Sequence, residues 1–586
     1  MLGNLVEYSD PVTGTFPMVG GPARVVLVDP ASRKCTNMNK TWTDHCDSAH
    51  PFCKNEEHSA EGETIFNPHP RLLIRVGTGP EDIHLEETRQ RHLKYAALSY
   101  CWGRTGGLKL ERSNVQDLKR RLPWSQLVKV HQDSIHYLWV DALCIVQDDP
   151  GEQIAEIMSM ASIYANAYIT IAASTSLGGN TGLFQTRQPT LRLSNMEHDG
   201  NTFDLYARES LEHVAFDYEY DALNPENARL WIGPNATVRR HFPLFTRGWA
   251  WRERLLSRRI IHFTRHELVW ECLGSTSCEC GAMDEFVGSQ ALRERRFAFG
   301  VPQDVEVRCG LMERSRKLAK HLSLSSETTS VNFSSFTERW DYALMYTIMG
   351  SAADKLFSTY DAEHYERWRD VISQFSRRNL TYESDVFPAV SGLAEVWIAR
   401  HQDCGEYLAG LWKADLMRGL LWICVDQYER SDTGRPSQYR APTWSWASVR
   451  RAINWLRASD TRDPNYIFGE VTEGHIEVSG RALTATVTSC GDTDACFKPV
   501  GSKASDPSEH FSPDSFPDVR ELIGHESLCL HWATDKIDAR TGSGWDRCLI
   551  LKACTATSST FVRIGITERL LEERKSLLQP CNIRII

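Results

Sequence analysis

The pattern of apolar and polar residues between Tyr95 and Ala172 alternates between two periods. Tyr95–Tyr100 is an apolar run of strand length, and Tyr168–Ala172 is a second short run of the same kind. Between them, Tyr137–Ile145 is almost wholly apolar, which is typical of a strand covered on both faces. Glu152–Asn166 has apolar residues at 154, 157, 158, 161 and 164, the period of a helix face. Alternating strands and helices predict an α/β domain with a mostly parallel sheet and its chemistry in loops at the strand ends.

The rest of the chain of 586 residues divides into regions of different pattern. Apolar runs at 259–264 and 267–272 predict a hairpin, and runs at 475–489 and 548–553 predict strands of a β-rich region. The segment 499–519 is rich in proline and serine and is predicted to be a flexible surface loop. The predicted boundaries are 1–94 for a partly irregular N-terminal lead-in, 95–285 for the α/β domain, 286–430 for a mainly helical region and 431–586 for the β-rich region.

Composition narrows the functional classes. The formal net charge of -10 disfavours a general electrostatic grip on nucleic acid or anionic lipid. Met1–Gly20 contains acidic residues and prolines but no continuous apolar segment, so we expect no export signal. The most apolar stretch, 408–425, carries three charged residues and is predicted to be a buried amphipathic helix rather than a membrane span. Seventeen cysteines without an export signal favour reduced thiols and a cytoplasmic protein.

One charged residue interrupts the apolar run at Tyr137–Ile145. Asp141 would be costly to bury there unless it is paired or hydrogen-bonded. Arg247, Arg254 or the loop amides after Trp102 are the candidate partners. Asp141 is therefore either half of a buried structural pair or a ligand contact at the carboxyl edge of the sheet.

The end of the first predicted strand offers further candidates for ligand binding. Ser99, Trp102 and Gly103 lie where the strand passes into a loop. Glycine lets a backbone approach a ligand closely, and tryptophan can stack on a nicotinamide or adenine ring. The alternative is a packed turn under an aromatic lid.

A possible metal site lies in the lead-in. Cys46, His50 and Cys53 are spaced at i, i+4 and i+7, so all three would share one face of a helix. Cys278 and Cys280 could add one or two thiolates and complete a tetrahedral zinc site. The alternative is ordinary reduced thiols with a surface histidine.

Several of these segments together resemble the fungal heterokaryon incompatibility (HET) domain. The resemblance covers about residues 95–285, and the matching pieces occur in the order that the family has. Two downstream motifs, Trp270–Cys272 and Ala441–Trp446, look like features that often accompany this domain. The matching pieces are Ala97–Gly103, Leu138–Gln147, Met160–Tyr164 and Arg247–Arg254 followed by Leu256 and Ser257.

The resemblance implies a role in fungal nonself recognition, in which such domains act as the toxic or death-triggering effector. The family is thought to be distantly related to TIR domains, which have a flavodoxin-like fold and in many cases hydrolyse NAD. We therefore expect a flavodoxin/TIR-like α/β domain with additional helical and β-rich C-terminal regions. Self-association or protein partners would control the effector.

Trp249 and Glu253 look similar to the tryptophan and catalytic glutamate of the TIR pattern. Cleavage of an N-glycosidic bond through an oxocarbenium-like state needs a carboxylate nearby, and Glu253 is the candidate for that role. NAD would be the substrate and the enzyme an NAD glycohydrolase. Alternatively, Glu253 pairs with Arg247 or Arg254 and only holds the loop together. The substrate-binding residues would be Ser99, Trp102, Gly103, Asp141, Arg247 and Trp249.

Two other functional classes stay open. The same fold could serve as a non-catalytic signalling or oligomerisation module, in which partners carry out the killing. A member of the family could also be recruited as an enzyme of secondary metabolism, which would require a large apolar pocket at the domain junction.

Overall fold

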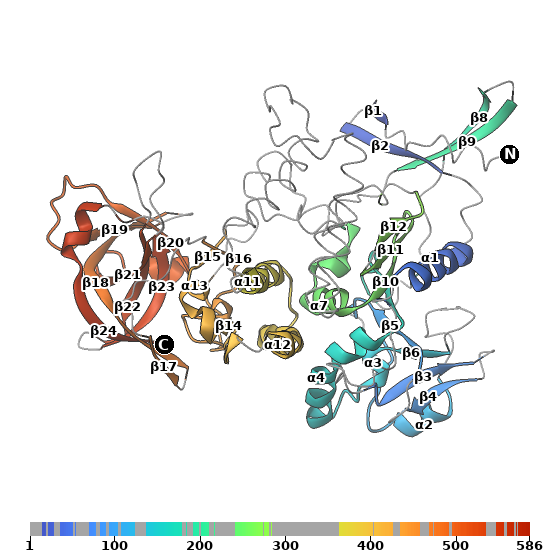
Figure 1. Cartoon of the computed structure of the whole chain (residues 1–586), viewed down its shortest axis with the longest axis horizontal. Coiled ribbons are helices and arrows are strands. Elements are labelled where there is room, and N and C mark those ends of the chain that lie inside the picture. The colour runs from blue at the N-terminus through green and yellow to red at the C-terminus, as the bar shows by residue number, and fades with distance from the viewer. Residues whose placement is uncertain are drawn as a thin grey trace, which may run out of the picture. The chain divides into compact units, whose positions relative to one another are not determined.

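The computed structural model divides the chain into two compact units, Met1–Ala353 and Asp354–Ile586, which we call unit 1 and unit 2 (Figure 1). Each unit is described by itself. The structure describes residues 14–18, 21–28, 35–50, 53, 69–77, 82–88, 93–103, 107–122, 136–178, 183, 191–198, 201–209, 216, 241–273, 275–280, 283, 363–401, 404–425, 434–456, 468–472, 474–491, 495–534, 546–555, 559–567, 570 and 572–586.

The main sheet of unit 1 is parallel at its centre and antiparallel at both edges. Four neighbouring strands, β10, β7, β5 and β6, run parallel, as the α/β pattern predicts. Antiparallel pairs flank them, and β10 and β11 form the predicted hairpin. In spatial order the strands are β12 (Thr276–Cys278), β11 (Leu268–Cys272), β10 (Arg259–Phe263), β7 (Ile169–Ala172), β5 (Tyr95–Ser99), β6 (Tyr137–Trp139), β3 (Leu72–Val76) and β4 (Ile83–Glu87).

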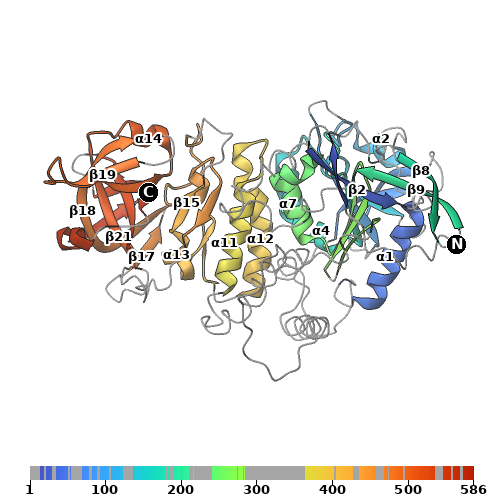
Figure 2. The same ribbon diagram turned by 90° about the horizontal axis from the view of Figure 1, so that it is seen from above.

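Helices cover both faces of this sheet, which explains why every residue of β5 and β7 is buried. α4 (Pro150–Asn166) packs against α7 (Gly248–Leu256) on one face, and α1 (Cys35–Ala49) lies on the opposite face beside β10 and β11 (Figures 1 and 2). α4 begins where Asp149 accepts hydrogen bonds from the backbone N–H groups of Gly151 and Glu152. The predicted helix at 152–166 is thereby confirmed.

The chain leaves β6 earlier than the apolar pattern predicts. Tyr137–Ile145 was expected to be one strand, but β6 ends at Trp139 and the helical turn α3 (Asp141–Cys144) follows. The backbone N–H of Cys144 donates to the carbonyl of Val140 at 2.7 Å, which closes this turn. Because Ala142, Leu143 and Cys144 are all buried, the turn is as apolar as a covered strand.

The segment before residue 95, expected to be a partly irregular lead-in, contains several helices and strands. Besides α1, β3 and β4, it holds two strands of a separate four-stranded antiparallel sheet of order β1-β2-β9-β8. The short helix α2 (Val115–Arg120) follows β5 in the chain. The strands of the smaller sheet are β1 (Gly14–Met18), β2 (Gly21–Val28), β8 (Leu191–His198) and β9 (Asn201–Glu209), and the short helix η8 (Pro243–Thr246) precedes α7.

Unit 2 begins with two helices that lie side by side, α11 (Glu363–Ser376) and α12 (Pro388–Arg400) (Figures 1 and 2). Trp368 and Trp397 join them with ring centroids 5.5 Å apart. The expected helical region from 286 to 362 lies outside the described residues. The stretch 408–425, expected to be one amphipathic helix, instead forms short elements: β13 (Tyr407–Leu408), β14 (Leu411–Trp412), η12 (Lys413–Asp415), α13 (Leu416–Gly419) and β15 (Trp422–Cys424).

The C-terminal part of unit 2 is β-rich, as predicted, and its strand pairings close into a ring. The path runs from β18 through β19, β20, β23, β22 and β21, and β21 pairs back with β18. Buried apolar residues such as Val487, Phe497 and Ile550 form the core of the ring. The strands are β17 (Phe468–Thr472), β18 (His475–Cys490), β19 (Ala495–Pro499), β20 (Glu509–Pro513), β21 (Glu526–Thr534), β22 (Asp546–Ala553), β23 (Thr560–Thr567) and β24 (Gln579–Ile585); β16 (Ile453–Trp455), η10 (Glu383–Val386), η13 (Trp446–Ser448) and η14 (Glu572–Leu577) lie outside the ring path.

The proline- and serine-rich segment 499–519, expected to be a flexible loop, contains regular structure. β20 joins the ring, and α14 (Phe516–Arg520) follows it. Phe511 and Val519 are buried in the core of the ring and hold the segment in place. Pro517 lies in the first turn of α14, where a missing backbone N–H costs nothing.

The tryptophan motif at Ala441–Trp446 has a packing role. The indole N–H of Trp444 donates to the carbonyl of Gly474 at 3.1 Å, and that of Trp446 donates to the carbonyl of Gly410 at 3.1 Å. Gly410 has a φ of 95°, and a Cβ there would lie 2.3 Å from the indole nitrogen of Trp446. The motif therefore fastens the turn between β13 and β14.

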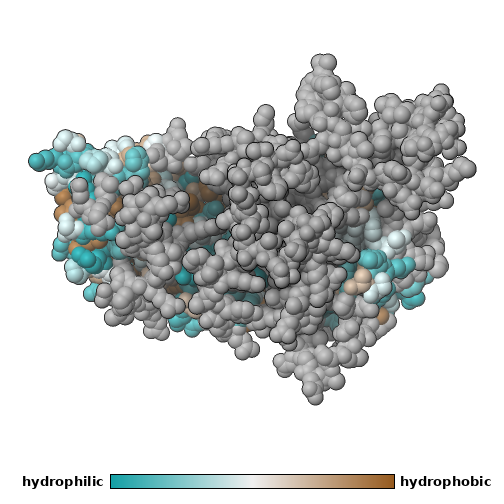
Figure 3. Space-filling view, turned by 45° about the horizontal axis from the view of Figure 1, so that its top comes forward, coloured by the Kyte–Doolittle hydropathy of each residue, from teal (hydrophilic) through white to brown (hydrophobic). Residues whose placement is uncertain are grey.

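The surface mixes polar and apolar residues. At the left of Figure 3, where unit 2 lies, teal and brown residues are interspersed. Large apolar side chains that are well exposed include Tyr439, Tyr382 and Leu177, at 82%, 67% and 65%. Among the helices in the described part of the chain, none combines the length and the apolar character needed to cross a membrane.

Candidate functional site

The helix α7 brings three consecutive charged residues into the interior of unit 1. Arg252, Glu253 and Arg254 are 0%, 6% and 6% exposed, because α7 packs against α4 and η8 and its side chains reach β5 and β11. The helix ends at Ser257, whose backbone N–H and hydroxyl both donate to the carbonyl of Glu253. Burial of three charges in one short helix requires a specific partner for each of them.

Glu253 lies at the carboxyl end of β5. The hydroxyl of Ser99, the last residue of that strand, donates to its Oε2 at 2.5 Å. Burial raises the pKa of Glu253 to about 7, the Ser99 hydroxyl lowers it in part, and the charge of Asp141 raises it further. Near neutral pH this carboxyl group therefore exists in both protonation states.

Asp141 lies just after β6, at the first position of α3. Its carboxylate accepts the indole N–H of Trp102 at 2.6 Å and the backbone N–H of Ala142 at 2.7 Å. Burial raises its pKa to about 6, while both hydrogen bonds and the charge of Arg247 lower it. The partners of Asp141 are thus neutral donors, namely the indole of Trp102, the amide of Ala142 and the hydroxyl of Tyr100, and Arg247 acts on it through its charge.

The register of the parallel strands explains why these residues converge. Ala97 of β5 lies beside Trp139 of β6, so Ser99 and Asp141 follow at the same edge of the sheet. The structure therefore brings Ser99, Trp102, Asp141 and Glu253 together, with Arg247 close enough to lower the pKa of both carboxyl groups.

Trp249 and Gly103 have other contacts. Trp249 carries the guanidinium of Arg252 over its ring at 4.6 Å, which is a cation–π contact. Gly103 has a φ of 77°, and a Cβ there would lie 3.0 Å from the Cα of Gly178. The loops that follow β5 and β7 thus touch through two glycines at the carboxyl edge of the sheet.

Comparison with known proteins identifies the middle of unit 1. Residues 95–253 match the family model described as "Heterokaryon incompatibility protein (HET)". The chain carries a HET domain. The match links the chain to heterokaryon incompatibility. The matched segment begins at the first residue of β5 and ends at Glu253. No curated protein and no solved structure matches the chain.

A buried network that the motif analysis missed adjoins the matched segment. Next to Glu253, Arg254 pairs with Glu271 on β11 through Nε at 2.9 Å and through Nη2. Glu271 Oε2 lies 3.1 Å from His262 Nε2, and His262 Nδ1 lies 2.9 Å from the hydroxyl of Ser174. The sequence does carry one signal for this network: Glu271 is a charged residue inside an apolar strand, like the feature that singled out Asp141.

This network has the order of a Ser–His–acid triad, but it is sealed. Ser174, His262 and Glu271 are 0%, 1% and 0% exposed, and the ring of Phe216 packs edge-on against His262. A neighbouring cavity of about 10 Å³, lined by His262 and Ser99 among others, has room for about one water molecule. The arrangement therefore holds charge inside unit 1 and gives a substrate no access to Ser174.

The predicted metal ligands divide into two groups. Cys46, His50 and Cys53 do come together, and the residue that joins them is Cys272. Cys278 and Cys280, expected to complete the site, lie with Glu267 in a second group. The reason is strand register: Cys278 lies opposite Val269, near the start of β11, whereas Cys272 is the last residue of that strand.

Proposed function

We propose that the HET domain is a death-triggering effector of fungal nonself recognition and that it hydrolyses NAD at the site around Glu253. The observation that carries the proposal is the contact between Glu253 and Ser99 at 2.5 Å, which holds a buried carboxyl group of pKa about 7 at the carboxyl edge of a parallel sheet. Carboxyl groups whose pKa lies near the working pH are characteristic of sites that perform acid–base or electrostatic catalysis.

The strand order supports a flavodoxin/TIR-like assignment. Numbered along the chain, the parallel strands β5, β6, β7 and β10 lie in the spatial order 2-1-3-4, which is how flavodoxin-like sheets begin. In such sheets ligands bind outside the carboxyl ends of the strands, where the chain reverses its direction of winding. That point is the end of β5, next to Ser99.

The proposed reaction requires little from the protein beyond charge and position. The bond between C1′ of the ribose and the pyridinium nitrogen breaks, and nicotinamide leaves with the bonding electron pair. Water adds to C1′ and loses one proton, so the products are ADP-ribose, nicotinamide and H⁺. Ionised Glu253 would stabilise the positive charge on the sugar in the transition state, and Asp141 and Trp102 would line the approach.

The first experiment measures nicotinamide release by the purified full-length protein. NAD is incubated with wild type, with Glu253→Gln and with Glu156→Gln, a matched control at a buried glutamate that pairs with Arg71. We expect release by wild type and Glu156→Gln and at least a hundredfold loss in Glu253→Gln, whose melting temperature at the assay pH should be no lower than that of wild type. Wild-type protein that stays inert when concentrated or oligomerised would refute the catalytic half of the proposal.

A second candidate function is a non-catalytic signalling module, which the low exposure of the central pair favours. Glu253 and Ser99 are 6% and 4% exposed, so their hydrogen bond also fastens α7 to β5. In that case cytoplasmic self-association or a protein partner would carry the signal. Toxicity on expression separates the two functions: a module remains toxic as Glu253→Gln, whereas an NAD hydrolase does not.

A further inference from the structure

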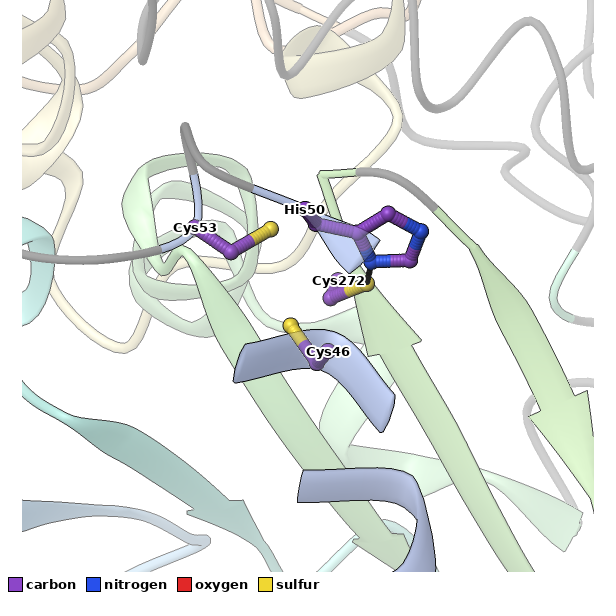
Figure 4. A group of neighbouring side chains, drawn as sticks. All are labelled: Cys46, His50, Cys53 and Cys272. Carbon is purple, nitrogen blue, oxygen red and sulfur yellow. Dashed lines mark hydrogen bonds between the residues drawn. The ribbon is translucent and has the colours of Figure 1, made fainter. Parts of the chain in front are cut away.

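A cluster of thiols and one imidazole lies on the face of the main sheet opposite to Glu253. The ligand atoms of Cys46, His50, Cys53 and Cys272 all lie within 4.8 Å of one another, and the side chains point toward a common centre (Figure 4). The Sγ of Cys272 is 3.4 Å from Nδ1 of His50. The three cysteines are 0%, 2% and 0% exposed.

We propose that these four residues bind a structural zinc ion. Zinc prefers four tetrahedral ligands of this kind, with Zn–S and Zn–N distances of about 2.3 and 2.0 Å, so neighbouring ligand atoms are about 3.5–3.8 Å apart. The distance of 3.4 Å between Cys272 Sγ and His50 Nδ1 is close to the expected S–N value, and no two of the four ligand atoms are more than 4.8 Å apart. Three sulfurs and one nitrogen form a closed set that leaves no position for a substrate, as in structural rather than catalytic zinc sites.

The surroundings of two sulfur atoms suit thiolates. Cys272 Sγ accepts the backbone N–H of Ser275 at 3.2 Å, and Cys46 Sγ accepts the guanidinium Nε–H of Arg259 at 3.3 Å. Arg259 is 1% exposed and lies opposite Cys272 in the β10–β11 pair. Donors of this kind offset part of the negative charge of three zinc-bound thiolates and hold the ligands in place.

The four ligands reach the cluster from two separate parts of the chain. The N–H of His50 donates to the carbonyl of Cys46, and the N–H of Cys53 donates to the carbonyl of His50, both at 3.0 Å. These turns continue from α1, which precedes the segment matched by the family model, whereas Cys272 follows that segment. Zinc would therefore fasten α1 to the end of β11 and clamp the HET domain across its edge.

The packing between α1 and β11 agrees with this clamp. Trp42 of α1 and Trp270 of β11 have ring centroids 6.4 Å apart, and Tyr168 donates a hydrogen bond to Asp47 at 2.9 Å. Trp270 and Cys272 share one face of β11, while Glu271 between them points to the other face and to Arg254.

The test uses the full-length chain, purified under reducing conditions after removal of any polyhistidine tag. We expect about one equivalent of zinc per chain by elemental mass spectrometry, and Cys53→Ser and Cys272→Ser should each lower the zinc content at least tenfold. The matched controls are Cys144→Ser, at a buried cysteine outside both groups, and Cys280→Ser, in the second group. Both controls should keep the full zinc content.

A second measurement does not depend on whether the variants fold. Wild-type protein loaded with Co²⁺ in place of zinc should show the strong visible bands of a tetrahedral site and sulfur-to-cobalt charge transfer. The proposal would be overturned if wild-type protein contained no metal, or if zinc survived Cys272→Ser but was lost in Cys280→Ser. It would also be overturned by a disulfide among Cys46, Cys53 and Cys272 in protein purified under reducing conditions.

Discussion

Two buried glutamates on the same face of the main sheet have opposite electrostatic environments. Burial alone would raise the pKa of Glu271, but Arg254 and His262 lower it well below its ordinary range. Burial also raises the pKa of Glu253, here to about 7, and the neutral hydroxyl of Ser99 compensates only in part. Glu253 forms no ion pair with any residue that the structure describes, whereas Glu271 forms an ion pair with Arg254 and lies 3.1 Å from His262 Nε2.

The difference separates a structural carboxylate from a candidate functional one. Glu271 stays charged and holds β10, β11 and α7 together, as a paired buried carboxylate does. Glu253 can gain or lose a proton near neutral pH, which is the property that a reaction or a switch needs. The charges of Arg252 and Arg247 lower the pKa of Glu253 only in part, and the guanidinium of the adjacent Arg254 binds Glu271.

The largest expected effect concerns Glu271, the structural carboxylate of the two. Arg254→Met leaves Glu271 buried without its guanidinium, so the free energy of unfolding should fall by about 3–5 kcal/mol. Denaturation with urea measures the loss. The control is Arg112→Met, which breaks an exposed pair with Asp149 and should change stability little. A loss in Arg254→Met no larger than in the control would show that Glu271 does not depend on this pair.

The next effect concerns the pH dependence of stability. The pKa of Glu253 is about 7 in the folded protein and about 4.5 when it is unfolded, so the folded state holds the proton more tightly. Its contribution to stability is complete below pH 4.5 and is lost as the pH rises to 7, by about 3 kcal/mol in total. The free energy of unfolding of Glu253→Gln, relative to that of wild type, should therefore rise by about that amount between pH 4.5 and 8. Urea denaturation at a series of pH values measures it. A stability difference that does not vary with pH would contradict the raised pKa.

The smallest expected effect concerns the hydrogen bond that Glu253, the candidate functional carboxyl group, accepts from Ser99. Ser99→Ala removes the hydroxyl that donates to Glu253, which should cost about 1 kcal/mol and move the pKa of Glu253 further upward. The midpoint of the pH-dependent loss of stability should shift to higher pH. Ser159→Ala, at an exposed serine of α4, provides the control and should leave the midpoint unchanged. A midpoint that moves to lower pH in Ser99→Ala would mean that the hydroxyl does not stabilise the ionised carboxylate.

Local pattern was enough to predict much of the main sheet of unit 1 and the helix α4. The period of the apolar residues identified β5, α4, β7 and the β10–β11 hairpin, because neighbours along the chain decide helix and strand periods. It failed at Asp141–Cys144, where a buried helical turn is as apolar as a buried strand. It failed again at 499–519, where the ring of unit 2 orders a segment of loop-like composition.

The sequence by itself determined the family, the central strands and three of the four residues of the proposed zinc site. It also determined that Asp141, as a charge in an apolar run, would need a polar partner. Only the tertiary structure decided that Glu253 meets Ser99, that Arg254 turns to Glu271, and that Cys272 rather than Cys278 completes the thiol cluster. Those contacts depend on the register of strands far apart in the chain, and a shift of one residue along β11 would exchange the faces of Glu271 and Cys272.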